Sequence, residues 1–171
     1  MAKIGIYGGS FNPVHFGHVG LAKWVVEHTD LDEVWLLVSP NNPLKDQSQL
    51  ADEQQRLADV KQAIRDIPGL HASDFEFSLP RPSYTANTLR ELTKAYPQHQ
   101  FSLIIGEDNW QIFDRWKEWQ FIQEHFPIFV YPRNLGHSKC LEHTNKEHVI
   151  YLEQAPYFDV SSTEIRNRRG R

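Results

Sequence analysis

Two histidines, His15 and His18, lie three residues apart in the stretch G-G-S-F-N-P-V-H-F-G-H, residues 8–18, directly behind the first apolar run of the chain. Side chains at this spacing on the first turn of a helix face the same side, so both rings would point past the end of the preceding strand. An ordinary surface pair, a metal site and a polyanion site are all compatible with this pattern. The metal site lacks a cysteine or an obvious third ligand nearby. The pattern favours the polyanion site, because imidazole N–H groups can bind phosphate oxygens and stabilise developing charge.

The glycines of the same stretch allow two interpretations. Gly8, Gly9 and Pro13 can form a tight strand-to-helix turn, because glycine adopts unusual backbone angles and proline fixes one. Glycine also lets a phosphate approach the backbone N–H groups at a helix start. The stretch matches neither G-x-G-x-x-G nor G-x-x-x-x-G-K-[ST], so the dinucleotide and P-loop fingerprints do not apply.

The elements that must position these residues follow from the hydrophobic pattern. Apolar runs predict strands at residues 4–7, 34–39, 70–77, 101–105, 128–131 and 149–152. Helical spacing predicts helices at residues 19–28, 51–67, 85–96, 108–124 and 161–168. This alternation predicts one α/β domain over residues 1–171, a Rossmann-like three-layer α/β/α arrangement with a mostly parallel sheet. Ligands of such sheets bind beyond the carboxyl ends of the strands.

Composition narrows the class of protein further. The 171 residues are 40% hydrophobic and 23% charged, with a formal net charge of -4. That balance is ordinary for a globular protein and argues against a general nucleic-acid binder, which usually carries a basic excess. Cys140 is the single cysteine, which rules out an intrachain disulfide and fits a reducing compartment. No apolar run reaches the roughly 20 residues that span a bilayer. We therefore expect a cytoplasmic protein without nucleic-acid or membrane partners.

Two motifs carry a family resemblance. G-G-S-F-N-P-x-H-x-G-H at residues 8–18 resembles the signature of the H-x-G-H nucleotidylyltransferases, and its full form looks like that of the bacterial nicotinate-nucleotide adenylyltransferases. V-S-S-T-E-I-R at residues 160–166 resembles the I-S-S-T-x-I-R signature near the end of the same family. The second motif also reads as a capping box, with Ser161 as the N-cap and Glu164 three residues later. The two interpretations agree, because a capped helix start beside Arg166 suits phosphates.

Four shorter segments also match the family; three of them have a plainer explanation, and the fourth departs from the family pattern. P-N-N-P-L-K at 40–45 resembles P-x-x-P-x-K, although Lys45 alone would be a solvated lysine. S-Y-T-A-N-T-L at 83–89 resembles S-Y-T-x-x-T-L, although Thr85 could simply cap a helix. I-I-G-E-D-N at 104–109 resembles I-I-G-x-D, although Asp108 could be an N-cap. Arg133 matches an arginine in R-P-G, although Asn134 and Leu135 intervene before the glycine here.

One aromatic and one basic residue, Trp116 and Arg56, also match positions of the family. Trp116 follows Asp108 by eight residues, where the family often has a tryptophan that could stack on a pyridine ring. Most of the five tryptophans are expected in the core. Arg56 matches a recurrent arginine, with a surface ion pair to Glu53 or Asp59 as the alternative. The family usually continues into another short helix, whereas this sequence ends at Arg171.

The resemblance implies a site, a reaction and a set of ligands. The implied catalytic residues are His15, His18, Lys45 and Arg166. The implied ATP-binding residues are Gly8, Gly9, Ser10, Phe11, His15, His18, Gly106, Asp108, Ser161, Ser162, Thr163, Ile165 and Arg166. The implied substrate contacts are Asn42, Lys45, Tyr84, Thr85, Trp116 and Arg133.

The implied reaction joins ATP and nicotinate mononucleotide to give deamido-NAD and pyrophosphate. Mg²⁺ would be bound mainly through the ATP phosphates, with no dedicated protein metal site, and the protein would be a monomer or homodimer. The alternatives are transfer to another phosphorylated acceptor, such as nicotinamide mononucleotide or phosphopantetheine, and a nucleotide-binding regulator that has lost catalysis.

Overall fold

Six strands form one sheet in a computed structural model of the chain, which describes residues 2–11, 13–40, 52–132 and 148–155. The strand order is β3-β2-β1-β4-β5-β6, and every pairing within the described residues is parallel. The strands are β1 (Lys3–Gly9), β2 (Glu33–Val38), β3 (Leu70–Ser73), β4 (Gln100–Gly106), β5 (Ile128–Tyr131) and β6 (Val149–Tyr151). The predicted parallel α/β sheet is confirmed.

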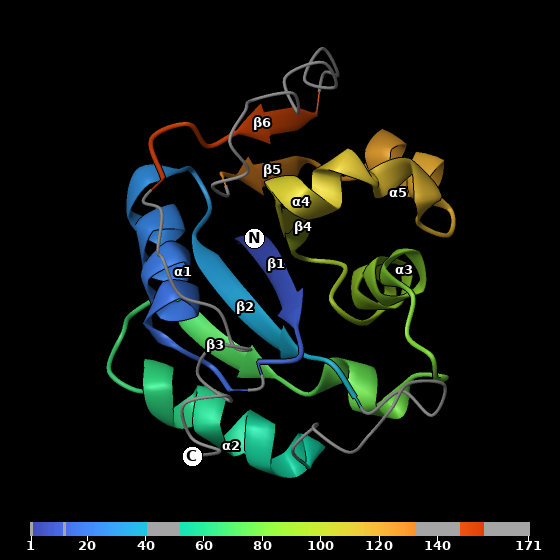
Figure 1. Cartoon of the computed structure of the whole chain (residues 1–171). Coiled ribbons are helices and arrows are strands. Elements are labelled where there is room, and N and C mark those ends of the chain that lie inside the picture. Colours follow the sequence, from blue (N-terminus) through green and yellow to red (C-terminus); the bar gives the residue numbers. More distant parts are fainter. Residues whose placement is uncertain (1, 12, 41–51, 133–147, 156–171) are drawn as a thin grey trace.

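Helices cover both faces of the sheet (Figure 1). On one face lie α1 (Phe16–His28) and α2 (Glu53–Ile64). On the other lie α3 (Thr85–Ala95), α4 (Glu107–Gln111) and α5 (Trp119–His125). Two short 3₁₀ turns, η1 (Phe75–Ser78) and η2 (Phe113–Arg115), complete the described elements. The predicted three-layer arrangement is therefore present.

Each face of the sheet has its own hydrophobic core, and β2 shows why the strands read as continuous apolar runs. Leu36 and Val38 pack with α1 and α2, whereas Leu37 between them packs with the helices of the other face. Successive side chains of a strand point to opposite faces, so a strand covered on both faces needs apolar residues at every position. This arrangement explains the uninterrupted stretch V-W-L-L-V.

The strand predicted at residues 70–77 is wrong in its second half. β3 ends at Ser73, and η1 follows at Phe75–Ser78. The Ser73 hydroxyl accepts the Phe75 N–H at 3.2 Å, and the Phe77 N–H donates to the Asp74 carbonyl at 2.9 Å. A local side-chain acceptor competes with the strand ladder here, as serine and aspartate often do.

The continuous helix predicted at residues 108–124 is also wrong. α4 ends at Gln111, η2 follows, and Glu118 adopts a left-handed conformation with φ 55° before α5 begins. The aromatic side chains of this stretch pack on one another, with the ring centres of Phe113 and Trp116 5.1 Å apart. A single helix could not turn all of these large rings toward one core, so tertiary packing overrides the helical pattern.

The other predicted elements agree with the structure apart from their ends. α1 begins at Phe16, three residues before the predicted start, and α2 spans Glu53–Ile64 within the predicted 51–67. The helix predicted at 161–168 lies outside the described residues. None of the helices in the described ranges has the length and apolar character that a membrane crossing requires.

Two isoleucines on adjacent strands offer a matched test of the core. Ile128 of β5 is 0% exposed, whereas Ile150 of the edge strand β6 is 42% exposed. We expect Ile128→Ala to lower the free energy of unfolding by about 2–5 kcal/mol, since it removes apolar area and leaves a cavity. Ile150→Ala should change it by about 0.5 kcal/mol or less. Chemical denaturation of both variants measures the difference, and equal losses would contradict the assigned burial.

Candidate active site

The candidate site lies where the strand order reverses. β1 pairs with β2 on one side and with β4 on the other, and the connections leave toward opposite faces of the sheet. The carboxyl ends of β1 and β4 therefore lie side by side, with Gly8 and Gly9 at one end and Gly106 at the other. Such a switch point is where open α/β sheets bind ligands.

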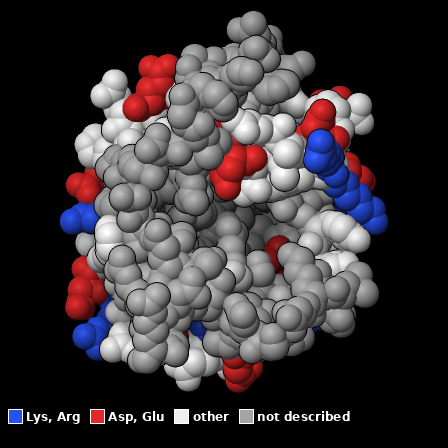
Figure 2. All heavy atoms as spheres, in the orientation of Figure 1, with Lys and Arg blue, Asp and Glu red and all other residues white. Residues whose placement is uncertain are grey.

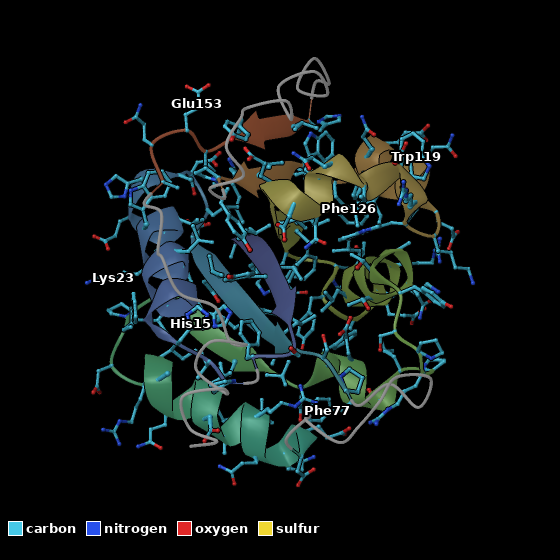
Figure 3. The ribbon with its side chains drawn as sticks, viewed as in Figure 1. His15, Lys23, Phe77, Trp119, Phe126 and Glu153 are labelled. Carbon is cyan, nitrogen blue, oxygen red and sulfur yellow. The ribbon has the colours of Figure 1, made fainter. Side chains whose placement is uncertain are left out.

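The two histidines form a stacked pair at the start of α1. Their ring centres are 3.7 Å apart and their planes differ by 24°. Figure 3 labels His15 at the end of α1 nearest the carboxyl ends of the strands. The sequence predicted that both rings point to one side of the first turn, and the stacking confirms it.

Hydrogen bonds to the backbone fix the orientation of both rings. His15 is the N-cap of α1, and its Nδ1 accepts the Gly17 N–H at 3.0 Å. His18 Nδ1 accepts the His15 N–H at 3.1 Å. This is a reciprocal capping box in which imidazoles replace the usual serine and glutamate. Histidine is not a preferred N-cap residue, which is why the sequence pattern placed the helix start too late.

The same bonds fix which ring nitrogen carries the proton. A neutral imidazole has one donor nitrogen and one acceptor nitrogen. Because each Nδ1 accepts a backbone N–H, the proton of a neutral ring lies on Nε2 in both His15 and His18. The pair therefore turns its two donor nitrogens away from the backbone it caps, which suits the binding of oxyanions.

Aromatic rings hold His18 from the sheet side. The Phe11 ring lies edge-on to it with centres 4.9 Å apart, and Tyr7 lies 6.3 Å away. Tyr7 in turn contacts Tyr131 of β5 at 5.9 Å. Phe11 has φ 49°, a left-handed conformation that is uncommon for a bulky residue. Its buried ring holds this backbone turn in place between Tyr7 and His18.

The glycines at the strand ends differ in what surrounds them. A Cβ on Gly106 would lie 2.6 Å from Asp108 Oδ1 and 3.0 Å from the Tyr131 ring, so a larger residue would displace both. A Cβ on Gly8 would meet no atom of the described residues within 4 Å. Within that part of the chain nothing requires glycine at position 8, which suits the close approach of a ligand.

Asp108 is not an N-cap. The N-cap of α4 is Gly106, without a side-chain capping bond, and Asp108 lies in the first turn with an exposed side chain. Its carboxylate lies beside Gly106, because a Cβ on that glycine would be 2.6 Å from Asp108 Oδ1. The structure thus leaves Asp108 exposed next to the carboxyl end of β4, where the family resemblance predicted a nucleotide contact.

Two of the segments assigned to the second substrate, the start of α3 and the stretch at Trp116, meet on the other face of the sheet. Tyr84 is the N-cap of α3 without a side-chain capping bond, and Thr85 is the first helical residue, so the capping interpretation of Thr85 is wrong. The Lys117 ammonium lies 4.5 Å from the centre of the exposed Tyr84 ring. Lys117 follows the half-buried Trp116, so the structure brings the start of α3 next to the Trp116 segment.

Arg56 is not a surface residue. It is 1% exposed, and its Nη1 donates to the carbonyls of Ser10 and Ser39, both at 2.8 Å. Burial lowers the pKa of its guanidinium. Glu53, the surface partner that the sequence suggested, binds Arg81 through both carboxylate oxygens at 2.7 and 2.8 Å. Helical spacing gave no sign of either long-range contact.

A buried carboxyl group that the sequence did not indicate lies beneath α3. Glu76 of η1 is buried, and its Oε2 accepts the Thr88 hydroxyl at 2.6 Å. Burial raises the pKa of Glu76, and the bond from Thr88 opposes that effect in part. The Thr88 hydroxyl is also 3.2 Å from the Tyr84 carbonyl. The carboxyl is thus linked to the N-cap of α3 through one hydroxyl.

Eight predicted site residues lie outside the described residues: Asn42, Lys45, Arg133, Ser161, Ser162, Thr163, Ile165 and Arg166. Lys45 and Arg166, the two predicted phosphate cations, are among these eight, so their roles stay predictions. The described lysines and arginines lie mainly toward the outline of the face drawn in Figure 2.

The parallel sheet, its switch point and the stacked histidines together define a nucleotidyltransferase site. A family model described as cytidylyltransferase-like matches residues 6–168. A probable nicotinate-nucleotide adenylyltransferase of Bacteroides fragilis is 47% identical over 164 residues, which are 96% of this chain and 80% of the relative. Its counterpart in Cytophaga hutchinsonii is 48% identical over 166 residues, 96% of this chain and 84% of the relative. The chain belongs to the cytidylyltransferase-like family and, within it, to the nicotinate-nucleotide adenylyltransferases.

Solved structures share the fold. The nicotinic acid mononucleotide adenylyltransferase of Plasmodium falciparum, described as complexed with NaAD, superposes with a TM-score of 0.79 at 20% identity, and the match covers 98% of this chain and 83% of that one. A putative nicotinate-nucleotide adenylyltransferase of Vibrio parahaemolyticus gives a TM-score of 0.65 at 25% identity, covering 84% and 80%. These likenesses agree with the Rossmann-like fold predicted from the sequence.

The raised pKa of Glu76 predicts a pH dependence of stability. Below the ordinary value of 4.5 the group is protonated whether the chain is folded or unfolded. As pH rises through the raised folded value, burial of the ionised carboxylate costs stability. We expect the free energy of unfolding of the wild type to fall relative to that of Glu76→Gln between pH 4 and pH 7, since glutamine keeps an acceptor for Thr88 without a charge.

Denaturant titrations at a series of pH values measure this difference. Glu124→Gln is the matched control, because Glu124 is exposed on α5. Its stability should follow that of the wild type at every pH. A difference between wild type and Glu76→Gln that does not change with pH would contradict the prediction.

Proposed function

We propose that this protein transfers the adenylyl group of ATP to nicotinate mononucleotide and releases deamido-NAD and pyrophosphate. The observation that carries the proposal is the His15–His18 pair, stacked at the switch point with both Nδ1 atoms bound to the backbone. The acceptor is taken from the relatives, which share 47–48% identity across almost the whole chain and are named for this reaction.

The proposed chemistry needs no strong base. The nucleophile is a phosphate monoester oxygen of nicotinate mononucleotide, which is largely ionised at pH 7 because its second pKa is near 6. It attacks the α-phosphorus of ATP, a new phosphorus–oxygen bond forms, and the bond to the bridging oxygen of the β-phosphate breaks. Pyrophosphate leaves with the electron pair. Catalysis is then a matter of alignment and charge stabilisation.

In the proposed mechanism, His15 and His18 donate from Nε2 to the phosphate oxygens of ATP. These donors are already oriented by the capping bonds of α1, so little reorganisation accompanies the reaction. The open space at Gly8 admits a phosphate to the backbone, and Lys45 and Arg166 neutralise the departing pyrophosphate. Asp108 faces the nucleotide.

The proposed pyridine-nucleotide contacts are Tyr84, Thr85 and Trp116, with Asn42 and Arg133. Support comes from the contact between Lys117 and the Tyr84 ring, which places the α3 start and the Trp116 segment together. A half-buried tryptophan can offer one face to a flat ring. Selection of nicotinate over nicotinamide would then depend on the hydrogen-bond donors that this region offers to the carboxylate of the nicotinate ring.

Mg²⁺ is proposed to arrive with ATP. The described ranges contain no group of three or more His, Cys, Asp or Glu side chains that could hold a metal ion, so a protein-built cage does not fit that part of the site. Mg²⁺ retains several waters and is commonly held through substrate phosphates, where it offsets their charge. We also propose a cytoplasmic monomer or homodimer, in line with the single Cys140.

Pyrophosphate release tests the proposed function directly. The protein is supplied with ATP and Mg²⁺, and nicotinate mononucleotide, nicotinamide mononucleotide and phosphopantetheine are offered in parallel. We expect a strong preference for nicotinate mononucleotide. Release with another acceptor alone would overturn the substrate but keep the chemistry, and ATP binding without any release would indicate a regulator.

We expect His18→Ala to lower kcat by about 10²-fold or more, since it removes an oriented donor from the transition state. The variant also loses the bond to the His15 N–H, which should cost about 1 kcal/mol of stability. Steady-state kinetics measured well below the melting temperature, together with circular dichroism, separate the two effects.

His28→Ala is the matched control on the same helix. His28 lies at the far end of α1, where its ring stacks on Trp24 and its Nδ1 is 2.9 Å from the Trp24 carbonyl. Its kcat should stay within about twofold of wild type, as for a surface change away from the site. Near-normal turnover of His18→Ala would remove His18 from the chemistry.

A further inference from the structure

Arg56 is a buried cation that the mechanism above does not use. It belongs to α2, yet its Nη1 reaches the backbone that follows two different strands. Ser10 follows β1 and Ser39 follows β2. A buried guanidinium is costly unless its donors are satisfied, and here two carbonyl dipoles at 2.8 Å compensate part of that cost.

The two contacted carbonyls belong to a joint between the strand ends. The last residues of β1 and β2, Gly9 and Val38, are partners in the sheet. Directly beyond them, the Ser39 N–H donates to the Gly9 carbonyl at 2.9 Å. Arg56 bridges Ser10 and Ser39, the next residue of each segment. It therefore extends the pairing of β1 and β2 by one step into the two loops.

The contact with Ser10 also fixes the turn that leads to the histidines. The peptide group is planar and trans, so its N–H points opposite to its carbonyl. Because Arg56 holds the Ser10 carbonyl, the N–H of Phe11 must point away from Arg56. Phe11 then turns into its left-handed conformation and places its ring edge-on to His18. A chain of contacts thus runs from Arg56 through Ser10 and Phe11 to His18.

An arginine is needed for this geometry. One Nη1 atom carries two N–H groups in a fixed plane, and each can serve a different carbonyl. A lysine side chain would keep the charge, but its three donors are not held in a fixed plane. It also ends in a single nitrogen, without the branched guanidinium that lets arginine reach further. The surface-exposed Arg65 at the end of α2, in contrast, lies 3.8 Å from Asp66 and has no such task.

We propose that Arg56 is a positioning residue for the ATP side of the site: it sets the shape of the β1–α1 loop and, through Phe11, the position of His18. The inference rests on the proposed function, because it assigns the phosphates of ATP to this loop. Arg56 acts through the backbone of Ser10 and not by touching the substrate. Its loss should therefore affect ATP more than the second substrate.

Arg56→Lys tests the proposal, with Arg65→Lys as the matched control on the same helix. We expect kcat/KM for ATP to fall by about 10- to 100-fold in Arg56→Lys, as for a small misplacement of reacting groups. KM for nicotinate mononucleotide should change less than KM for ATP, since the described contacts proposed for it, at Tyr84, Thr85 and Trp116, lie on the face of the sheet that α3 covers. Arg65→Lys should match the wild type in both parameters.

A purely structural role gives a different result. If Arg56→Lys lowers the melting temperature but keeps the wild-type kcat/KM for ATP at a temperature where it is folded, the proposal is overturned. The same holds if both substrates lose affinity equally. Calorimetric titration with ATP alone makes the readout independent of the acceptor, so a failed adenylyl transfer in the wild type would contradict the proposed function and not this inference.

A measurement on the wild type covers the case in which Arg56→Lys does not fold. The ¹⁵N and ¹H resonances of the Arg56 guanidinium are recorded before and after addition of ATP. We expect them to shift on binding, because the proposal places the phosphates of ATP at the loop whose backbone Arg56 binds. Resonances that do not respond to saturating ATP would overturn the proposal.

Discussion

The hydrogen bonds that close the first turn of α1 are made by the two rings on which the proposed reaction depends. A helix start leaves backbone N–H groups without partners, and here the Nδ1 atoms of His15 and His18 satisfy two of them. These capping hydrogen bonds thereby fix the tautomer of each neutral ring and the orientation of both rings. When this turn forms, the Nε2 donors of His15 and His18 are oriented by the same hydrogen bonds. Helix formation and the geometry of the proposed site therefore depend on each other.

The surroundings of this turn are packed in the core that covers one face of the sheet. α1 and α2 pack on the same face of the sheet, and α2 carries Arg56, which grips the chain just before the turn. On the sheet side, Tyr7 and Phe11 limit the movement of His18. Precision in the site therefore derives mostly from packing and from backbone carbonyls.

Much of the fold could be predicted from the sequence, because strands buried on both faces give uninterrupted apolar runs. β5 spans Ile128–Tyr131 as predicted to the residue. The pattern failed where a local acceptor or a group of large rings competed with it, at Ser73 and around Phe113. Hydrophobic periodicity reports neither side-chain hydrogen bonds to the backbone nor the packing of large rings on one another.

The site was partly predictable for a related reason. Motif spacing placed His15 and His18 together, and the strand–helix alternation placed the loops after the strands at the carboxyl edge of one parallel sheet, where β1 and β4 end side by side. The burial of Arg56 and Glu76 could not be predicted, because each depends on partners distant along the chain. A charged residue on an amphipathic helix looks the same in sequence whether it meets water or a buried carbonyl.

The pairing of β1 with β4 has a consequence for how the chain reaches its working state. Residues 3–73 wind into β1, β2 and β3 with α1 and α2, and residues 85–151 wind into β4, β5 and β6 with α3, α4 and α5. Of the described strand pairings, β1–β4 alone joins these halves, and it brings Lys3 beside Gln100. Contacts of such long sequence separation form late, because the loop-closure entropy must be overcome first. The proposed nucleotide site spans this seam, because His15 and His18 follow β1 whereas Gly106 and Asp108 follow β4. The two groups of residues therefore come together only through the pairing of β1 with β4.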